Sequence, residues 1–223
     1  TVTENIMPEI AERLAQEIDL DGRKKAIDAF NASHTTLKKG IALMPVTFGI
    51  SFNAPVLNQA GALVHVYTDG SVHLNHGGTE MGQGLFTKVA QVVSSVFQVD
   101  IDHVKISATR TDKVPNTTPT AASAGSDLNG MAAFNAATEI RERMAGVVAE
   151  HFDVPADDIE FRQNRVYAGN ESLSFAEAAQ KTWSERVSLS ATGYYKTPDI
   201  HWDSETMTGS PFYYFTFGAS VSE

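Results

Sequence analysis

Two loops rich in glycine and hydroxyl side chains contain the residues best suited to chemistry. Residues 77–84 read Gly-Gly-Thr-Glu-Met-Gly-Gln-Gly, and residues 117–126 read Thr-Thr-Pro-Thr-Ala-Ala-Ser-Ala-Gly-Ser. Small side chains let the backbone approach a ligand closely, and each loop leads into a predicted helix whose first N–H groups attract anions. We therefore predict that the two loops hold one polar, phosphate-bearing ligand between two helix amino ends.

Neither loop matches a nucleotide-binding motif. A dinucleotide fingerprint would place its third glycine at position 87, where Thr87 stands, and a phosphate-binding loop would need a Lys-Ser/Thr pair. Two structural explanations stay open: a turn that only lets a strand pack on a helix for residues 77–84, and a flexible linker for residues 117–126. The Ala-Ala-Ser-Ala stretch suits close packing against a flat ligand better than it suits a solvated linker.

Three histidines lie on the strands of a predicted hairpin and form a candidate metal site. His65, His73 and His76 would all have to reach one ion from the same face of the sheet. His73 and His76 are three positions apart, so they point to opposite faces of a regular strand. We therefore expect no zinc site here.

The carboxylates do not suggest a catalytic pair. Asp157, Asp158 and Glu160 follow a predicted turn, where an acidic cluster is usually a solvated surface. Glu80 lies within the first loop, and its position favours fixing the loop or the start of the following helix over acting as a base. We assign no catalytic residue to this sequence.

Composition and charge exclude several classes of protein. The chain has 223 residues with 27 acidic and 17 basic side chains, a net charge of -10, and no cysteine. The acidic excess argues against nucleic acid as a partner, and no apolar run approaches the roughly 20 residues of a membrane-spanning helix. The absence of cysteine removes disulfides, thiolate zinc sites and Cys-ligated iron–sulfur clusters, so we expect a cytoplasmic protein.

Hydrophobic periodicity and turn residues predict both helices and strands. Thr68-Asp69-Gly70-Ser71 between two alternating runs predicts a hairpin. The other predictions are helices at residues 6–20, 21–31, 85–97, 128–150 and 172–182, and strands at residues 104–107, 161–167, 187–195 and 212–221. Ser126-Asp127 and Ser172 are the predicted caps of the last two helices. Trp183, Trp202 and the aromatic residues of 212–217 are expected in the core or packed on a sheet.

These elements predict an α+β fold, with a mixed or antiparallel sheet and packed helices. Three segments follow along the chain: an N-terminal helical segment at 1–37, an α+β unit with the two loops at 38–150, and an α+β continuation at 151–223. The chain begins with Thr rather than Met, and its β-rich end runs to Glu223 without a turn. We therefore expect a truncated piece of a longer protein.

Several segments, in order, resemble the molybdenum hydroxylase family. They read Phe-Gly-Ile-Ser-Phe at 48–52, an Asn-Gln-Ala-Gly-Ala run within 57–71, the glycine loop at 77–85 and Val-Pro-Asn-Thr-Thr-Pro-Thr-Ala-Ala-Ser at 114–123. The match covers roughly residues 38–223 and is similar to the molybdopterin-binding region of xanthine dehydrogenases. The resemblance implies part of a larger molybdenum-cofactor-binding domain.

The resemblance also implies which residues bind the cofactor and the substrate. In the family, the segment matching the first loop contacts the pterin, with Gln83 hydrogen-bonding to it, and the second loop lines the cofactor. The implied cofactor-binding residues are Met81, Gly82, Gln83, Ala122, Ser123, Ala124 and Gly125. Phe52 stands where the family stacks an aromatic ring on a flat substrate, and Asn53 is the adjacent substrate-binding position.

Two positions depart from the family pattern. Asn53 stands where xanthine-oxidising members usually have Thr, and its larger amide changes the hydrogen bonds that a purine would meet. Phe86 stands where the family commonly has His, which removes a polar group close to the pterin. These differences leave the exact substrate open.

The activity that the resemblance implies is hydroxylation of purines, from hypoxanthine and xanthine to urate, with oxygen from water. The resemblance also implies iron–sulfur clusters and FAD in other domains or subunits. It implies that the catalytic base, a Glu, lies beyond the last residue of this sequence. We expect the isolated fragment to be inactive and to hold no cofactor, because a ligand cradled by several segments loses contacts when few are present. An aldehyde oxidase-like hydroxylase fragment and a non-catalytic scaffold fragment remain the alternatives.

Overall fold

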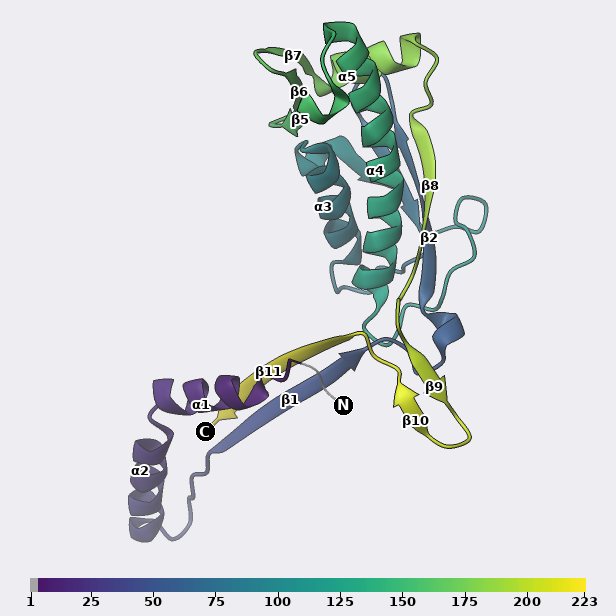
Figure 1. Cartoon of the computed structure of the whole chain (residues 1–223). Helices are drawn as coiled ribbons and strands as arrows, with labels where there is room; N and C mark the ends of the chain where they lie inside the picture. The colour runs from purple at the N-terminus through teal and green to yellow at the C-terminus, as the bar shows by residue number, and fades with distance from the viewer. Residues whose placement is uncertain (1–3) are drawn as a thin grey trace. The chain divides into compact units, whose positions relative to one another are not determined.

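The computed structural model describes residues 4–223, and its contacts divide them into two compact units (Figure 1). The loop unit comprises Ala54–Pro198 and contains both loops. The ribbon unit comprises residues 4–53 together with Asp199–Glu223. The division predicted at 1–37, 38–150 and 151–223 uses other boundaries and stays a prediction.

A four-stranded mixed sheet forms the centre of the loop unit. Its order is β4-β3-β2-β8, with β3 and β4 parallel and the other pairs antiparallel. The strands are β2 (Gln59–Val66), β3 (Val72–His76), β4 (Val104–Ile106) and β8 (Ser190–Lys196). The Gly70 N–H donates to the Tyr67 carbonyl at 2.9 Å in the turn that joins β2 to β3. The predicted hairpin and the α+β class are confirmed.

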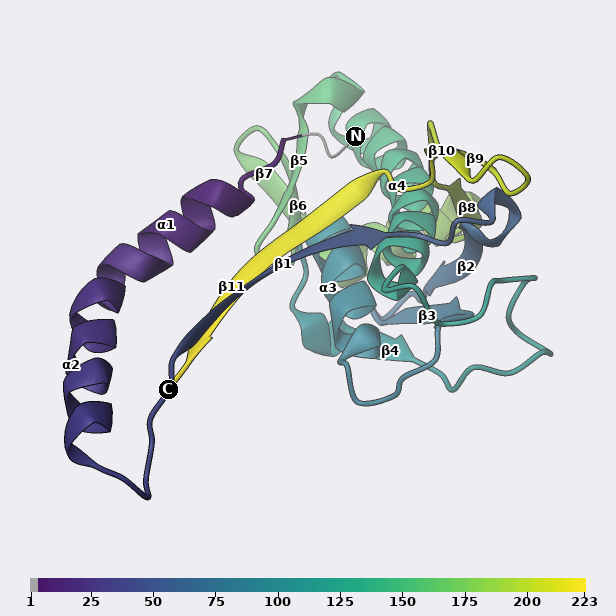
Figure 2. The ribbon, with the colours of Figure 1, turned by 90° about the horizontal axis from the view of Figure 1, so that it is seen from below.

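Helices α3 (Leu85–Phe97) and α4 (Gly125–Phe152) lie side by side in the loop unit (Figures 1 and 2). α3 buries Leu85, Val89, Val93 and Phe97, which recur every four residues and so form one apolar face. This spacing is why the sequence predicts the helix with the bounds that the structure has.

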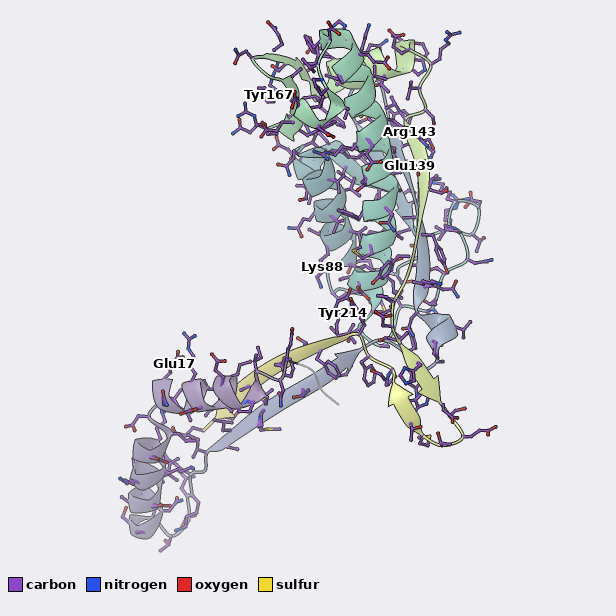
Figure 3. All side chains as sticks on the ribbon, viewed as in Figure 1. Glu17, Lys88, Glu139, Arg143, Tyr167 and Tyr214 are labelled. Atoms are coloured by element: carbon purple, nitrogen blue, oxygen red, sulfur yellow. The ribbon has the colours of Figure 1, made fainter. Side chains whose placement is uncertain are left out.

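Helix α4 packs very closely on β2 and β8. A Cβ atom at Gly193 of β8 would lie 1.9 Å from the Ala132 carbonyl oxygen, so this contact requires glycine. Arg143 extends from α4 to β8, where its Nη1 donates to the Ser190 carbonyl at 3.0 Å (Figure 3). The position of β8 therefore fixes α4, whose first turn adjoins the second loop.

A small antiparallel sheet and a short helix complete the loop unit. The sheet has the order β5-β6-β7, and the elements are β5 (Ile159–Arg162), β6 (Arg165–Ala168), β7 (Glu171–Ser174) and α5 (Phe175–Ser184). The single strand predicted at 161–167 is wrong. Gln163 and Asn164 have φ values of 50° and 62°, and these left-handed residues form the hairpin turn without the glycine that usually signals one.

Two predicted helix caps are also wrong. α5 is capped by Ser174 rather than Ser172, in a capping box where the Glu177 N–H donates to the Ser174 Oγ at 3.2 Å. α4 begins before Ser126 and Asp127, which lie inside its first turn, while Ala124 occupies the cap position. Three single-turn 3₁₀ helices connect other elements at Pro55–Leu57, Ile101–His103 and Ala156–Asp158.

The ribbon unit is built on an antiparallel pair of long strands, with Ala42 opposite Ser222 and Ile50 opposite Tyr214. α1 contacts both strands, and the unit also contains a hairpin that the sequence analysis missed. The elements are α1 (Met7–Glu17), α2 (Leu20–Ser33), β1 (Ala42–Ile50), β9 (His201–Asp203), β10 (Thr208–Ser210) and β11 (Tyr214–Ser222).

The exposed surface of Trp183 shows that one further prediction is wrong. Trp183 was expected in the core or on a sheet, but it lies on α5 with 61% of its surface exposed. Trp202 is partly buried on β9. Across residues 4–223, every helix is too short or too polar to cross a membrane.

Candidate functional site

The first loop follows directly from β3 and is pressed against the second. A Cβ atom at Gly77 would lie 2.1 Å from Thr117 Cγ2, and one at Gly78 would lie 2.5 Å from Leu85 Cδ2. Any larger residue at either position would displace a neighbour. The two leading glycines therefore serve packing, as the structural alternative for this loop proposed.

Hydrogen bonds also join the first loop to its neighbours. The Thr79 N–H donates to Thr120 Oγ1 at 2.8 Å, which links the first loop directly to the second. Thr109 Oγ1 donates to the Gly78 carbonyl at 3.0 Å from the other side. The two loops lie together, as the hypothesis of one shared ligand requires.

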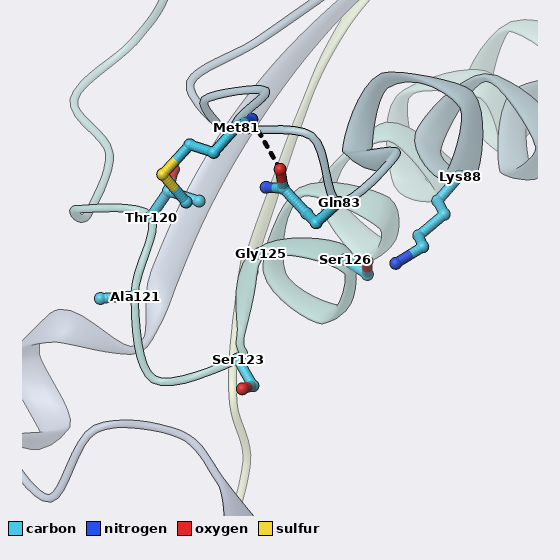
Figure 4. Close-up of a pocket in the computed structure, with 8 residues that line it drawn as sticks. All are labelled: Met81, Gln83, Lys88, Thr120, Ala121, Ser123, Gly125 and Ser126. Carbon is cyan, nitrogen blue, oxygen red and sulfur yellow. Dashed lines mark hydrogen bonds between the residues drawn. The ribbon is translucent and has the colours of Figure 1, made fainter.

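A cavity of about 460 Å³ opens between the two loops (Figure 4). Its lining residues are Met81, Gln83, Lys88, Thr120, Ala121, Ser123, Gly125 and Ser126. Four predicted cofactor residues line it, whereas Gly82, Ala122 and Ala124 lie in the same loops without lining it. The sequence analysis missed Lys88, although it stands one helical turn after the last glycine of the loop.

Glu80 occupies the amino end of α3. Its Oε1 accepts hydrogen bonds from the N–H groups of Gly82 at 2.9 Å and Gly84 at 3.0 Å, and its Oε2 accepts one from Phe86 at 3.1 Å. The backbone N–H of Phe86, followed by those of Gly84 and Gly82, lowers the pKa of this exposed carboxyl. The predicted structural role of Glu80 is confirmed, but the predicted open helix end is wrong for α3.

The side chain of Gln83 also makes contacts within its own loop. Its Oε1 accepts from the Met81 N–H at 2.6 Å, and its Nε2 donates to the Thr79 carbonyl at 2.9 Å (Figure 4). An amide has two donor hydrogens and two acceptor lone pairs, so one of each remains for a ligand. Gln83 is therefore both fixed in position and able to bind.

The second loop has an unusual backbone. Ala122 and Ser123 have φ values of 53° and 56°, and consecutive left-handed residues other than glycine are costly. The chain turns there directly into α4, whose cap position holds Ala124 with no side-chain cap. Within the part of the chain that the structure describes, no acceptor bonds the N–H groups of Gly125 or Ser126. Asp127 lies in this first turn, so the start of α4, like that of α3, has a carboxylate nearby.

Buried polar atoms adjoin the first loop from beneath. His76 is 2% exposed, and its Nδ1 accepts from the Gly78 N–H at 3.1 Å, which places the ring hydrogen on Nε2. Its Nε2 and the Oδ1 of Asn129 are buried without a partner among residues 4–223. Burial lowers the pKa of His76 to about 4, so the ring is neutral at pH 7.

The histidines and acidic residues singled out in the sequence lie apart from this cavity's lining. His65 and His73 stack across the β2–β3 hairpin with ring centroids 6.1 Å apart, while His76 is buried. Among the described residues, no group of three or more His, Asp or Glu side chains is arranged to hold a metal ion. Asp157, Asp158 and Glu160 are exposed, as predicted for a solvated surface.

The two predicted substrate residues belong to the ribbon unit, so they are described separately from the cavity between the loops. Phe52 is partly buried there, directly after β1. Asn53 lines a second cavity of about 350 Å³ together with Trp202, Phe212 and Phe215. The aromatic residues of this cavity were predicted only as core or sheet-packing side chains.

The cavity between the loops fits a flat, polar cofactor. Hydroxyl groups, backbone N–H groups and one amide can donate hydrogen bonds to it, while small residues such as Gly125 and Ala121 leave room for rings. These donors would hold a cofactor but would not coordinate its metal.

Comparison with known families finds a match over almost the whole chain. The family model described as a molybdopterin cofactor-binding domain matches residues 13–223. This range includes both loops and the cavity between them.

Curated relatives show the same similarity in sequence. Xanthine dehydrogenase of Oryza sativa subsp. japonica is 48% identical over 204 residues, which cover 92% of this chain and 13% of that protein. Xanthine dehydrogenase/oxidase of Felis catus is 43% identical over 217 residues, which cover 97% of this chain and 15% of that protein. The chain thus spans only a small part of the length of these relatives.

Solved structures share the fold. A reconstituted CO dehydrogenase from Oligotropha carboxidovorans has a TM-score of 0.79 at 18% identity, covering 96% of this chain and 28% of that one. Quinoline 2-oxidoreductase from Pseudomonas putida 86 has a TM-score of 0.74 at 18% identity, covering 95% of this chain and 30% of that one. At this identity the likeness concerns the fold alone.

Proposed function

We propose, from the premise that this chain belongs to the molybdopterin cofactor-binding domain family, that the cavity between its two loops binds the pterin of the molybdenum cofactor. The observation that supports the proposal most strongly is the joint lining of one 460 Å³ cavity by both loops. The first loop contributes Met81 and Gln83, and the second contributes Thr120, Ala121, Ser123, Gly125 and Ser126.

Each loop has a distinct part in holding the cofactor. Gln83, fixed by its two internal hydrogen bonds, directs its remaining donor and acceptor to the pterin, with Met81 and Gly82 beside it. The second loop, residues 122–125, offers small side chains and backbone N–H groups. When bound, the molybdenum cofactor supplies a two-electron oxidation of carbon with oxygen from water. The described residues orient that group and exclude water from one side of it.

The parent protein is proposed to hydroxylate purines, because the similar curated proteins are named xanthine dehydrogenases. Phe52 and Asn53 are the proposed substrate contacts, with Phe52 stacking on the purine ring. The proposal includes iron–sulfur clusters and FAD in other domains or subunits, a role in purine catabolism and a cytoplasmic location. The general base is proposed to come from outside the chain described here.

Filling the cavity tests cofactor binding in the full-length parent. Ala121 lines the cavity and is exposed, so Ala121→Phe should occupy the space of the pterin without disturbing the core. We expect molybdenum and pterin content per protein to fall at least tenfold, measured by elemental analysis and pterin fluorescence. The matched control, Ala156→Phe on an exposed turn, should keep both. Full cofactor content in Ala121→Phe would refute the assignment of this cavity.

An aldehyde oxidase-like activity is the second candidate, favoured by Asn53. Its amide, beside Trp202 and Phe212, offers a different set of donors and acceptors from the Thr usual in xanthine-oxidising members. Turnover of xanthine and of an aromatic aldehyde should be compared on one molybdenum-loaded sample, and again after Asn53→Thr. Preference for the aldehyde would change the assigned substrate from a purine to an aldehyde. A parent that lacks molybdenum would favour a non-catalytic scaffold role.

A further inference from the structure

We propose that the outer face of the four-stranded sheet docks an acidic segment of the parent polypeptide, from outside the 223 residues of this chain. The outer face is the one turned away from α4, and it comprises outward side chains of β2, β3, β4 and β8 with the loop at residues 107–116. A cavity on this face shares no lining residue with the cofactor cavity, so docking there is independent of cofactor binding.

Strand periodicity determines which side chains the outer face carries. The residue that precedes each of His65, His73 and Lys105 is a valine buried in the core. Because successive side chains of a strand point to opposite faces, these three residues lie on the outer face. The strand register places them in one row, with His65 opposite His73 and His73 opposite Lys105. The row therefore forms a cluster of basic groups across three strands.

Further lysines extend this cluster. Burial, and then the charges of His65 and Lys113, lower the pKa of His73, so Lys113 of the loop lies close to the row. Lys196 is exposed opposite Gln59, at the far corner of the sheet from Lys105. The ion pairs that the described residues form do not include Lys105, Lys113 or Lys196. These ammonium groups are therefore available to a partner.

Acidic side chains are scarce on this face. The four strands contain no aspartate or glutamate, although the chain has 27 acidic residues. Asp112 of the loop pairs with Arg110 at 3.1 Å. In the turns next to β3 and β4, Asp69 accepts the Ser71 N–H at 2.9 Å and Asp102 is exposed. The outer face is thus basic in a chain of net charge -10, which suits an acidic partner.

A cavity of about 540 Å³ lies on the outer face between the sheet and the loop. Its lining includes Gly61, Leu63 and Tyr194 from the sheet, and Val114 and Pro115 from the loop. A Cβ atom at Gly61 would lie 2.6 Å from Pro115 Cγ, so the loop rests directly on the sheet. Tyr194 is 56% exposed. The cavity therefore offers an apolar side chain of a docked segment a place to bury its surface.

The cavity adjoins lysines and histidines along both strands that form its floor. His65 follows Leu63 by two positions on β2, and Lys196 follows Tyr194 by two positions on β8, so each pair shares the outer face. Lys113 itself lines the cavity. An occupant with an apolar side chain between carboxylates would fill the cavity and pair with lysines on either side.

The rest of the parent polypeptide is the occupant that best fits these observations. The chain matches only 13% and 15% of the lengths of two curated relatives, so most of a parent of similar length lies outside it. A segment of the same polypeptide is also held at a high effective concentration, which favours its docking over that of a separate protein.

The test is carbodiimide cross-linking of the full-length parent, which joins a lysine amine to a carboxylate only where the two are in contact. Peptide mass spectrometry locates each joined pair. Lys181 and Glu185, whose ion pair measures 3.0 Å, are the internal positive control. A mixture of isotope-labelled and unlabelled parent shows whether a joined pair comes from one polypeptide or from two.

We expect at least one of Lys105, Lys113 and Lys196 to be joined to a carboxylate of the same polypeptide outside these 223 residues. The proposal is overturned if these lysines are joined only to carboxylates within the 223 residues or to another polypeptide, or are not joined at all, while Lys181 and Glu185 are joined. Either result is obtained whether or not the parent holds molybdenum, so it is separate from the test of the cofactor cavity.

Charge reversal gives a second readout on the segment that cross-linking identifies. In the parent with Lys105→Glu and Lys113→Glu, amide hydrogen exchange of that segment should become about tenfold faster, because like charges now repel it. The matched control, Lys24→Glu with Lys25→Glu on an exposed part of α2, makes the same change in net charge and should leave the exchange unchanged. If circular dichroism shows that the reversed variant does not fold, Lys105→Gln with Lys113→Gln replaces it. Exchange at the wild-type rate in the folded variant would overturn the proposal.

Discussion

The two loops at the cavity have similar compositions, but they differ in the hydrogen bonds that they make and in how they begin their helices. The first is saturated internally: Glu80 caps α3, Gln83 spans the loop, and His76 supports Gly78 from beneath. The second gives α4 no side-chain cap at Ala124 and holds Ala122 and Ser123 in left-handed conformations. The comparison teaches that glycine content alone does not make a ligand site. The hydrogen bonds that each loop makes within itself also decide which groups it can offer to a ligand.

The largest expected effect concerns the support of the first loop by His76. Burial lowers the pKa of the folded His76 to about 4, whereas an unfolded histidine titrates near 6.5. The unfolded chain therefore takes up this proton first as pH falls, and stability is lost between about pH 6.5 and 4. The loss amounts to up to about 3 kcal/mol. Between pH 7 and pH 4.5, His76→Gln should therefore lose less unfolding free energy than the wild type. Urea unfolding at the two pH values measures the difference.

His201→Gln is the matched control, because His201 is exposed on β9. It should keep the pH dependence of the wild type. If His76→Gln also kept it, the first loop would not depend on a neutral buried ring.

The second prediction concerns the contact between the loops. Gly77→Val places atoms where Thr117 Cγ2 already lies 2.1 Å from the position of a Cβ, so we expect a loss of about 1–3 kcal/mol in unfolding free energy. Thr117→Gly in the same chain should restore part of that loss, as a double-mutant cycle measures. Additive effects of the two substitutions would show that the loops do not constrain each other.

The third prediction concerns the amino end of α3, which the carboxylate of Glu80 caps. The folded pKa of Glu80 is lowered, so its stabilising effect is present above the unfolded pKa and is lost as pH falls through the folded value. Glu80→Gln should lower the melting temperature at pH 7, and the difference from wild type should vanish at pH 2. Glu142→Gln, at an exposed position on α4, should leave the melting temperature unchanged. A Glu80 effect independent of pH would show that charge is not its cause.

The smallest expected effect concerns strain in the second loop. Ser123→Gly relieves a left-handed conformation and should raise the unfolding free energy by about 1 kcal/mol. Ser126→Gly, inside the first turn of α4, should instead lower it by up to about 1 kcal/mol. Urea unfolding measures both. Equal signs for the two changes would remove strain as a distinguishing property of this loop.

The sequence predicted most of the elements that have a simple period. Helix α3 and the β2–β3 hairpin follow from apolar spacing and from Asp69-Gly70, which are local signals. The turn at Gln163-Asn164 was missed because its left-handed residues include no glycine. The α4 cap was misplaced because the cap position is Ala124, whose side chain cannot accept the hydrogen bond that usually signals a helix start.

The candidate site was predictable in its loops but not in its details. Motif resemblance led to Met81, Gln83, Ser123 and Gly125, which line the cavity. Lys88 was missed because nothing in the local sequence shows that its side chain extends across to α4. The closure of α3 by Glu80 depends on the fold of the loop itself, which spacing alone does not encode.

The pairing of β1 with β11 has a consequence for the order of folding during synthesis. Ser51 Oγ donates to the Pro211 carbonyl across 160 positions of the chain, and all of Ala54–Pro198 emerges between them. At about 5–20 residues per second, the ribosome leaves β1 without its partner for roughly 10–30 s. During that time the unpaired strand, whose Met44, Val46 and Phe48 stay exposed after pairing, can bind chaperones or aggregate.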